Sequence, residues 1–190
     1  MVVAEKCFSD CEFSAFVAFE RGSQLERIEG SAFGCHTGLQ SICIPASVEE
    51  LGEKCFSNCW SLFSVTFERG SRLTTIASSA FDGCSHLPFL VIPASVLALE
   101  NRCLSRCYSL VCVTFERGSK LKKIGESAFE YCSHLPFICI PAGVKALEDH
   151  CFSMCHSLRL VTFGKDSQLR KVGAEAFSCA GSICVCLPCK

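Results

Sequence analysis

The feature that most constrains the fold of this chain is a tandem repeat of 48 residues. The motif Phe-Glu-Arg-Gly begins at Phe19, Phe67 and Phe115, and the register continues at Phe163. The motif Ile-Pro-Ala recurs at the same interval, at Ile44, Ile92 and Ile140. Because four copies account for essentially all of the 190 residues, we expect one domain over residues 1–190 that is built by repetition.

Each 48-residue copy contains two related halves. The landmark apolar positions are spaced alternately by 25 and 23 residues, at Phe8, Phe33, Phe56, Phe81, Leu104, Phe129, Phe152 and Phe177. Each half reads roughly A-F-x-x-C-x-x-L-x-x-I-x-I-P-x-S-V, and a period of this length with spaced aliphatic residues is typical of a leucine-rich solenoid. The sequence therefore predicts a repeat solenoid of eight rungs.

The pattern within one rung predicts its local structure. Leu62, Val65 and Phe67 match L-x-x-L-x-L, so we expect a parallel β-strand with Val65 and Phe67 pointing inward. Residues 48–59 carry apolar side chains at i, i+3, i+7, i+8 and i+11, which predicts a short helix or 3₁₀ turn. The Gly of Phe-Glu-Arg-Gly permits a positive φ after the strand. Asp166 takes this position in the fourth copy and is expected to tolerate the same conformation.

Composition and charge exclude several classes of protein. The chain has 18 Lys and Arg against 19 Asp and Glu, which argues against a globally basic nucleic-acid binder and against an acidic tail protein. Hydrophobic residues make up 49% of the chain, so we do not expect disorder. The first residues lack the pattern of a secretory signal, and no apolar run is long enough to span a bilayer.

The recurring motifs resemble the cysteine-containing leucine-rich repeats of the BspA type, also called Treponema-type repeats. Residues 80–87 read A-F-x-x-C-x-x-L and residues 92–96 read I-P-x-S-V. The resemblance covers nearly the whole chain and implies a curved or spiral solenoid of stacked parallel strands. It also implies protein interaction or cell-surface adhesion, an extracellular or cell-surface location, and no enzymatic activity. The 25-residue halves, the extra cysteines and the missing export signal depart from the family pattern.

Twelve of the 18 cysteines follow the repeat. Eight occur once per rung, with two displaced by one position: Cys11, Cys35, Cys59, Cys84, Cys107, Cys132, Cys155 and Cys179. Four replace the Ala of A-F in alternate rungs: Cys7, Cys55, Cys103 and Cys151. We expect these side chains to be small buried hydrophobes stacked as ladders, with thiols that bond weakly to the backbone. Disulfides between adjacent rungs and a metal held by C-x₃-C pairs are the alternatives.

Six cysteines do not follow either ladder. They are Cys43, Cys112, Cys139, Cys184, Cys186 and Cys189. The last three cluster near the end of the chain and are predicted to be free or intermolecular thiols, with a metal site as the alternative.

No catalytic or cofactor-binding constellation is recognisable. His86 and His134 occupy the same repeat position, so they reflect duplication rather than a site. No phosphate-binding Gly-rich loop, zinc-protease motif or paired-carboxylate motif is present. We therefore expect a non-enzymatic protein with no cofactor and no nucleic-acid partner.

The most distinctive surface prediction is an apolar stripe on the strand face. One outward column is predicted to contain Phe16, Ser41, Phe63, Phe89, Cys112, Phe137 and Leu160. Its neighbour is predicted to contain Ala18, Cys43, Thr66, Val91, Thr114, Cys139 and Thr162. Exposed apolar patches usually mark an interaction surface, so we expect a protein partner or a second copy to bind here. The alternatives are a flanking segment that covers part of the stripe, or a register that differs from this one by one residue.

The ends of the chain and the charge distribution suggest how copies would associate. Neither end carries a distinct polar cap, which solenoids normally need. Residues 1–95 contain 6 Lys and Arg against 11 Asp and Glu, whereas residues 96–190 contain 12 against 8. Opposite charges favour head-to-tail docking into rings or filaments. The alternative is a monomeric adhesion or ligand-binding module cut from a larger surface protein.

Overall fold

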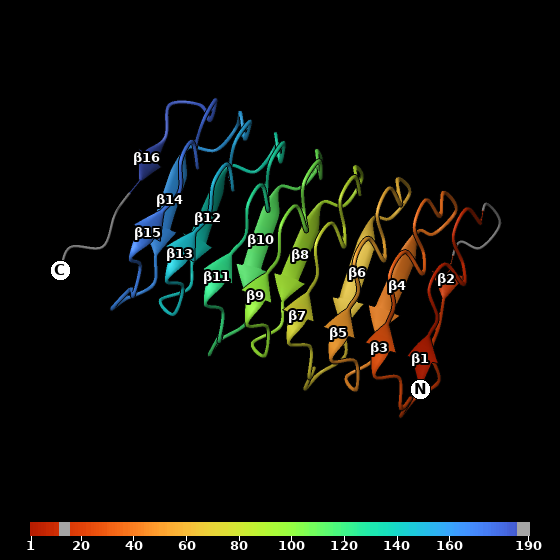
Figure 1. Ribbon diagram of the computed structural model, residues 1–190. Helices are drawn as coiled ribbons and strands as arrows, with labels where there is room; N and C mark the ends of the chain where they lie inside the picture. Colours follow the sequence, from red (N-terminus) through yellow and green to blue (C-terminus); the bar gives the residue numbers. More distant parts are fainter. Residues whose placement is uncertain (12–15, 186–190) are drawn as a thin grey trace.

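The computed structural model describes residues 1–11 and 16–185 as a single β-solenoid (Figure 1). The odd-numbered strands pair in parallel in one sheet, which we call the continuous sheet. They are β1 (Val2–Val3), β3 (Arg27–Ile28), β5 (Glu50–Leu51), β7 (Thr75–Ile76), β9 (Ala98–Leu99), β11 (Lys123–Ile124), β13 (Ala146–Leu147) and β15 (Lys171–Val172). This succession of rungs confirms the predicted repeat solenoid.

The even-numbered strands form a second parallel face, which we call the divided sheet because its hydrogen bonding is interrupted. They are β2 (Phe16–Val17), β4 (Ser41–Ile44), β6 (Ser64–Phe67), β8 (Phe89–Ile92), β10 (Cys112–Phe115), β12 (Phe137–Ile140), β14 (Leu160–Phe163) and β16 (Cys184–Val185). They pair in three groups, β2-β4-β6, β8-β10 and β12-β14-β16.

The number of residues between successive strands and a proline before the second strand together explain where the divided sheet is interrupted. Steps of 23 residues, such as β4 to β6, keep four paired residues. The longer step from β2 to β4 keeps two pairs, whereas β6 does not pair with β8 and β10 does not pair with β12. Pro88 and Pro136 precede β8 and β12 at the position that Gln40 holds before β4. Proline has no amide hydrogen to donate to the preceding strand.

The core lies between the two sheets and repeats along the solenoid axis. The inward positions of the continuous sheet are fully buried at Ile28, Leu51, Ile76, Leu99, Ile124 and Leu147. Val65 is buried and Phe67 packs half-buried against the core, as the strand pattern predicted. Phenylalanine rings stack from rung to rung, with centroids 5.1 Å apart for Phe33 and Phe56 and 5.0 Å apart for Phe129 and Phe152. Leu104, which is also fully buried, interrupts the stack.

The predicted helix or 3₁₀ turn over residues 48–59 is wrong. The segment contains β5 and tight turns in which Lys54 and Asn58 have φ of 56°. Its amides alternate between bonds to the next rung, such as Phe56 N to Ala80 O at 2.8 Å, and isolated turns within the segment, such as Ser57 N to Lys54 O at 3.0 Å. The apolar residues are spaced as in a helix because residues with positive φ turn the chain at each corner, so that the side chains that follow point back into the core. Asp166 has φ of 59° at the glycine position, as predicted.

Candidate functional site

The apolar column predicted from the sequence lies on the outer face of the divided sheet. Phe16 is 68% exposed, Phe89 50% and Phe137 52%. Phe16 pairs with Ser41, Phe89 with Cys112, and Phe137 with Leu160. The neighbouring column contains Cys43 opposite Thr66, Val91 opposite Thr114, and Cys139 opposite Thr162. Across the described rungs neither column contains a charged residue, so this face offers apolar and weakly polar contacts.

The prediction that Phe63 belongs to the first column is wrong by one residue. Ser64, not Phe63, pairs with Ser41. Phe63 lies one position earlier, where its amide donates to Gln40 O at 2.9 Å. Leu62 and Val65 are the inward residues on either side of Phe63 and Ser64, so the strand pairing alone distinguishes the two outward positions. Phe63 remains 48% exposed and borders the apolar face instead of lying in its first column.

A hollow of about 490 Å³ opens on this face where β10 and β12 fail to pair. Its lining includes the apolar side chains of Phe115, Phe137 and Cys139 together with Glu116. The two additional residues of the 25-residue half widen the corner between the strands. The interruption in strand pairing therefore produces a concave region on an otherwise flat sheet face.

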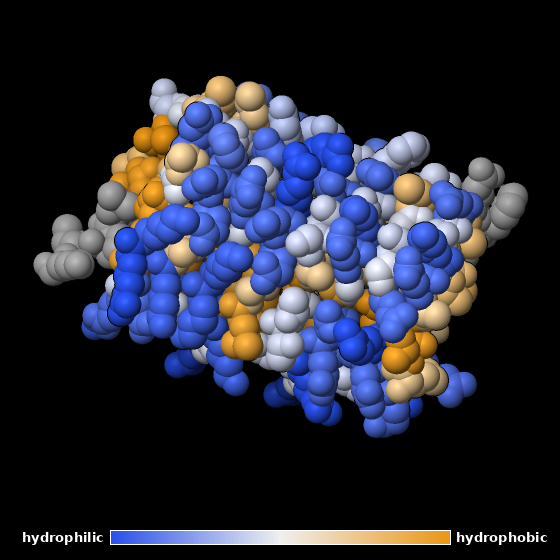
Figure 2. Space-filling model, viewed as in Figure 1, coloured by the Kyte–Doolittle hydropathy of each residue, from blue (hydrophilic) through white to orange (hydrophobic). Residues whose placement is uncertain are grey.

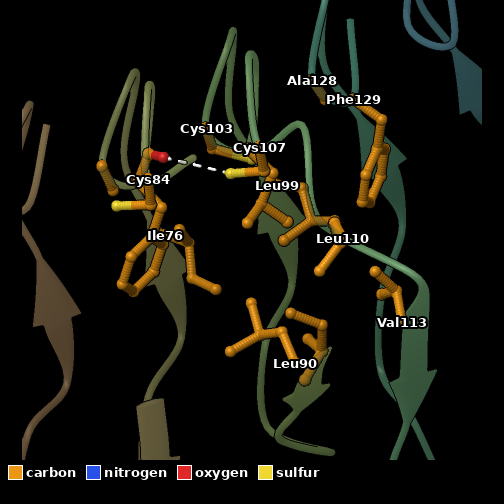
Figure 3. Close-up of a cluster of buried hydrophobic side chains, with 14 of the residues drawn as sticks. Ile76, Cys84, Leu90, Leu99, Cys103, Cys107, Leu110, Val113, Ala128 and Phe129 are labelled. Atoms are coloured by element: carbon orange, nitrogen blue, oxygen red, sulfur yellow. Dashed lines mark hydrogen bonds between the residues drawn. The ribbon is translucent and has the colours of Figure 1, made fainter. Parts of the chain in front are cut away.

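Eight cysteines are fully buried in the core: Cys55, Cys59, Cys84, Cys103, Cys107, Cys132, Cys151 and Cys155. Five of these thiols donate to a backbone carbonyl of the preceding rung, for example Cys84 Sγ to Phe56 O at 3.1 Å and Cys107 Sγ to Phe81 O at 3.3 Å. Figure 3 shows the Cys107 bond as a dashed line beside Cys84 and Leu110. Burial raises the pKa of Cys59 and of Cys155 to about 12. These thiols are therefore protonated core groups and poor nucleophiles at neutral pH.

The two displaced cysteines do not occupy the buried column. Cys35 and Cys179 are exposed in the left-handed corner conformation. His36 takes the buried position in the second rung, where its Nδ1 accepts a hydrogen bond from Leu39 N at 3.1 Å. Burial lowers the pKa of His36, and the bond to Nδ1 requires the neutral ring. At the first rung, Cys7 is exposed and Cys11 is half-buried.

The cysteines outside the ladders lie on or near the divided sheet. Cys43, Cys139 and Cys184 are exposed and Cys112 is half-buried. Within residues 1–11 and 16–185, no group of three or more His, Cys, Asp or Glu side chains is arranged to hold a metal ion. Cys186 and Cys189, the other two predicted intermolecular thiols, lie outside the described residues.

Charge changes sign along one column beside the continuous sheet. Lys122, Lys145 and Arg170 lie on consecutive rungs, since Lys145 N donates to Lys122 O and Arg170 N to Lys145 O, each at 2.8 Å. Towards the N-terminus the same column contains Glu26 and Glu49. The opposite charges of the two halves are thus displayed on one side of the solenoid. Figure 2 shows a largely hydrophilic face, with apolar groups near the C-terminal end at the upper left and further apolar groups in the lower middle and at the lower right.

Among the described residues there is no helix that could cross a membrane.

Comparison with solved structures identifies bacterial solenoids of the same design. The Treponema pallidum leucine-rich repeat protein is 28% identical with a TM-score of 0.76, and the match covers 86% of this chain and 74% of that one. A leucine-rich repeat protein of Eubacterium ventriosum is 22% identical with a TM-score of 0.66, covering 96% and 41% of the two chains. One from Bacteroides ovatus is 22% identical with a TM-score of 0.60, covering 90% and 49%. The chain therefore spans half or less of the latter two proteins.

No curated protein sequence matches the chain. The model of the BspA type leucine rich repeat region does match, over residues 2–135 and 61–184 with six copies. Together these ranges include both the Phe-Glu-Arg-Gly and the Ile-Pro halves. The chain therefore belongs to the BspA-type leucine-rich repeat family.

Proposed function

We propose that the protein is a non-enzymatic interaction module whose apolar face on the divided sheet binds protein, and in particular further copies of itself. Leucine-rich repeat proteins are generally protein-interaction modules, and solenoids use their extended faces for binding. The observation that carries the proposal is the row of half-exposed phenylalanines, Phe16, Phe89 and Phe137, in a column without charge. Ser41 and Ser64 separate Phe16 from the other two, whereas Phe89, Cys112, Phe137 and Leu160 follow one another in the column. Contiguous apolar groups mark interfaces in soluble proteins.

Head-to-tail growth into filaments is the form of assembly that the terminal rungs support best. β1 and β15 are the edge strands of the continuous sheet, and an edge strand is a template for further pairing. Phe8 stacks on Phe33 at one end and Phe177 on Phe152 at the other, with centroids 5.1 Å and 5.6 Å apart. Stacking of Phe177 on Phe8 of the next copy would continue the core. The basic column of one copy would then approach the acidic column of the next.

Electron microscopy of the purified chain tests this assembly. We expect uniform fibres two solenoids wide, because the apolar faces also pair, and we expect Val172→Lys to abolish them because it places a charge on the β15 edge. Val172 continues the inward column after Leu147 and is 45% exposed at the open end of that column, so the added charge lies at the end of the core rather than within it. The matched control is Thr74→Lys, an exposed position in the column of Lys122 and Lys145, which should leave the fibres intact. Dispersed particles of the unchanged chain at high concentration would contradict head-to-tail growth.

A monomeric adhesion or ligand-binding module within a larger cell-surface protein is the second candidate. It is supported by the coverage of the solved structures, since the chain spans only 49% of the Bacteroides ovatus protein and 41% of the Eubacterium ventriosum protein. In that setting the apolar face would bind a different protein, and the terminal rungs would continue into neighbouring repeats. The same microscopy distinguishes the candidates, because a module of this kind gives no fibres.

A further inference from the structure

A row of exposed rings follows one edge of the solenoid, at the corner just after the buried thiol column. Trp60 is 55% exposed, Tyr108 42%, and His156 is also exposed. Ser85 and Ser133 hold the same corner position in the intervening rungs. Rings therefore alternate with hydroxyl groups along the solenoid axis.

The backbone under the ring row is fixed by bonds between rungs. His86 Nδ1 lies 2.6 Å from Trp60 O, and His134 Nδ1 lies 2.7 Å from Tyr108 O. The next residues continue the register, since Ser109 N donates to Ser85 O at 3.1 Å. The spacing of the rings is thus set by the rung repeat.

A polar hollow of about 290 Å³ lies between the first two rings. It is lined by Asn58, Trp60, Gly83, Ser85, Arg106 and Tyr108. Arg106 is held in place by two hydrogen bonds to Asp82, at 2.9 Å and 2.5 Å, so its charge is balanced. The hollow therefore presents amide, hydroxyl and guanidinium groups between two aromatic rings without a net charge.

The composition of this edge differs from that of the rest of the molecule. The chain has 16 Phe but one Trp and two Tyr. The Trp and one Tyr belong to the ring row, and Tyr131, which is 37% exposed, lies on the adjoining corner position. Aromatic residues that carry a polar group suit surfaces that must be apolar on one side and hydrated on the other.

We propose that this edge binds a neutral β-1,4-linked hexopyranose chain, of the cellulose or chitin type, that lies parallel to the solenoid axis. Two rungs of roughly 4.8 Å separate successive rings by about 10 Å, which is close to the length of one disaccharide unit in such a chain. Every second sugar then presents its apolar C–H face to a ring. The hydroxyl groups of the intervening sugar face Ser85, Asn58 and Arg106. An α-1,4-linked chain curls and does not match a straight row.

Trp60, as the single tryptophan, reports binding directly. Titration with cellohexaose and with chitohexaose should shift Trp60 fluorescence to shorter wavelength in a saturable manner for at least one of them. Which of the two binds distinguishes unmodified from N-acetylated sugars. Maltohexaose, the α-linked isomer of cellohexaose, should cause no shift. Absence of a response to both β-linked probes at millimolar concentration would overturn the proposal, as would an equal response to maltohexaose.

Calorimetric titration of variants tests the role of the rings. We expect Trp60→Ala and Tyr108→Ala each to weaken binding about tenfold, whereas Tyr108→Phe, which keeps the ring, should bind within about twofold of the unchanged chain. Phe137→Ser, on the apolar face, should bind the saccharide normally. Unchanged affinity in both alanine variants would overturn the proposal. The proposal is independent of self-assembly, so either can fail without the other.

Discussion

Raising the pH from about 8 to about 10 under reducing conditions is expected to unfold the protein. Burial raises the pKa of all eight core thiols, so they remain protonated in the folded state. In the unfolded chain a thiol ionises near pH 8.5. The stabilisation is therefore complete below that pH and is lost as the pH rises towards the folded-state value, which is about 12 for Cys59 and Cys155.

The expected size of this effect exceeds the stability of an ordinary domain. At pH 10 each thiol favours the unfolded chain by about 2 kcal/mol. Eight buried thiols together contribute roughly 16 kcal/mol, whereas a domain is typically stable by about 5–15 kcal/mol. Circular dichroism during an alkaline titration in a phosphine reductant should show a steep loss of structure between about pH 9 and pH 10.

The chain itself offers the matched control for this titration. Ala32, Ala80 and Ala128 occupy, in alternate rungs, the position that Cys55, Cys103 and Cys151 occupy in the others. The triple variant Cys55→Ala, Cys103→Ala and Cys151→Ala should therefore fold and release three fewer protons on unfolding. Its free energy of unfolding should fall less steeply with pH and its transition should move to higher pH. A variant transition that coincides with that of the unchanged chain would contradict the buried-thiol account.

Truncation of a stacked phenylalanine is expected to be the most damaging single substitution. Phe56 is fully buried, with ring centroids 5.1 Å from Phe33 and 5.3 Å from Phe81. Phe56→Ala removes both ring contacts and leaves a cavity, so we expect the free energy of unfolding in urea to fall by about 3–5 kcal/mol. Because the solenoid core is continuous from rung to rung, the substitution should destabilise the neighbouring rungs as well.

Leu104 supplies the control for the phenylalanine stack. It is fully buried at the same position in the fifth rung, which shows that the site accepts leucine. Phe56→Leu should therefore cost no more than about 1.5 kcal/mol. An equal loss for the leucine and alanine variants would mean that ring stacking itself, and not the filling of the core, determines the stability of the rung.

The repeat made most of the architecture predictable. The 48-residue step and the L-x-x-L-x-L pattern place Leu62, Val65 and Phe67 correctly, because a strand fixes inward positions by simple alternation. The corners were less predictable, because their apolar spacing suits a helix as well as a turn with left-handed residues. Lys54 and Asn58 adopt positive φ although neither is glycine. Inter-rung hydrogen bonds, which no local pattern reveals, sustain that conformation.

The candidate site was predictable in its location but not in its details. The exposed column was found from the strand pattern, yet Phe63 was misplaced because two outward positions precede Val65 and only pairing with Ser41 separates them. The hollow beside Phe137 depends on the lost pairing after β10, which requires Pro136 and the longer half together. The ring row was missed, although Trp60, Tyr108 and His156 are spaced by 48 residues.

The central claim is that the apolar face of the divided sheet binds a second copy. It is tested most directly by sedimentation velocity in the Val172→Lys background, where growth through the β15 edge is blocked. We predict that this chain sediments as a dimer and that adding Phe89→Ser and Phe137→Ser converts it to a monomer. Adding Trp60→Ser, an equally exposed aromatic on another edge, should leave the dimer intact. A monomer with both phenylalanines present, or a dimer that persists without them, would contradict the account.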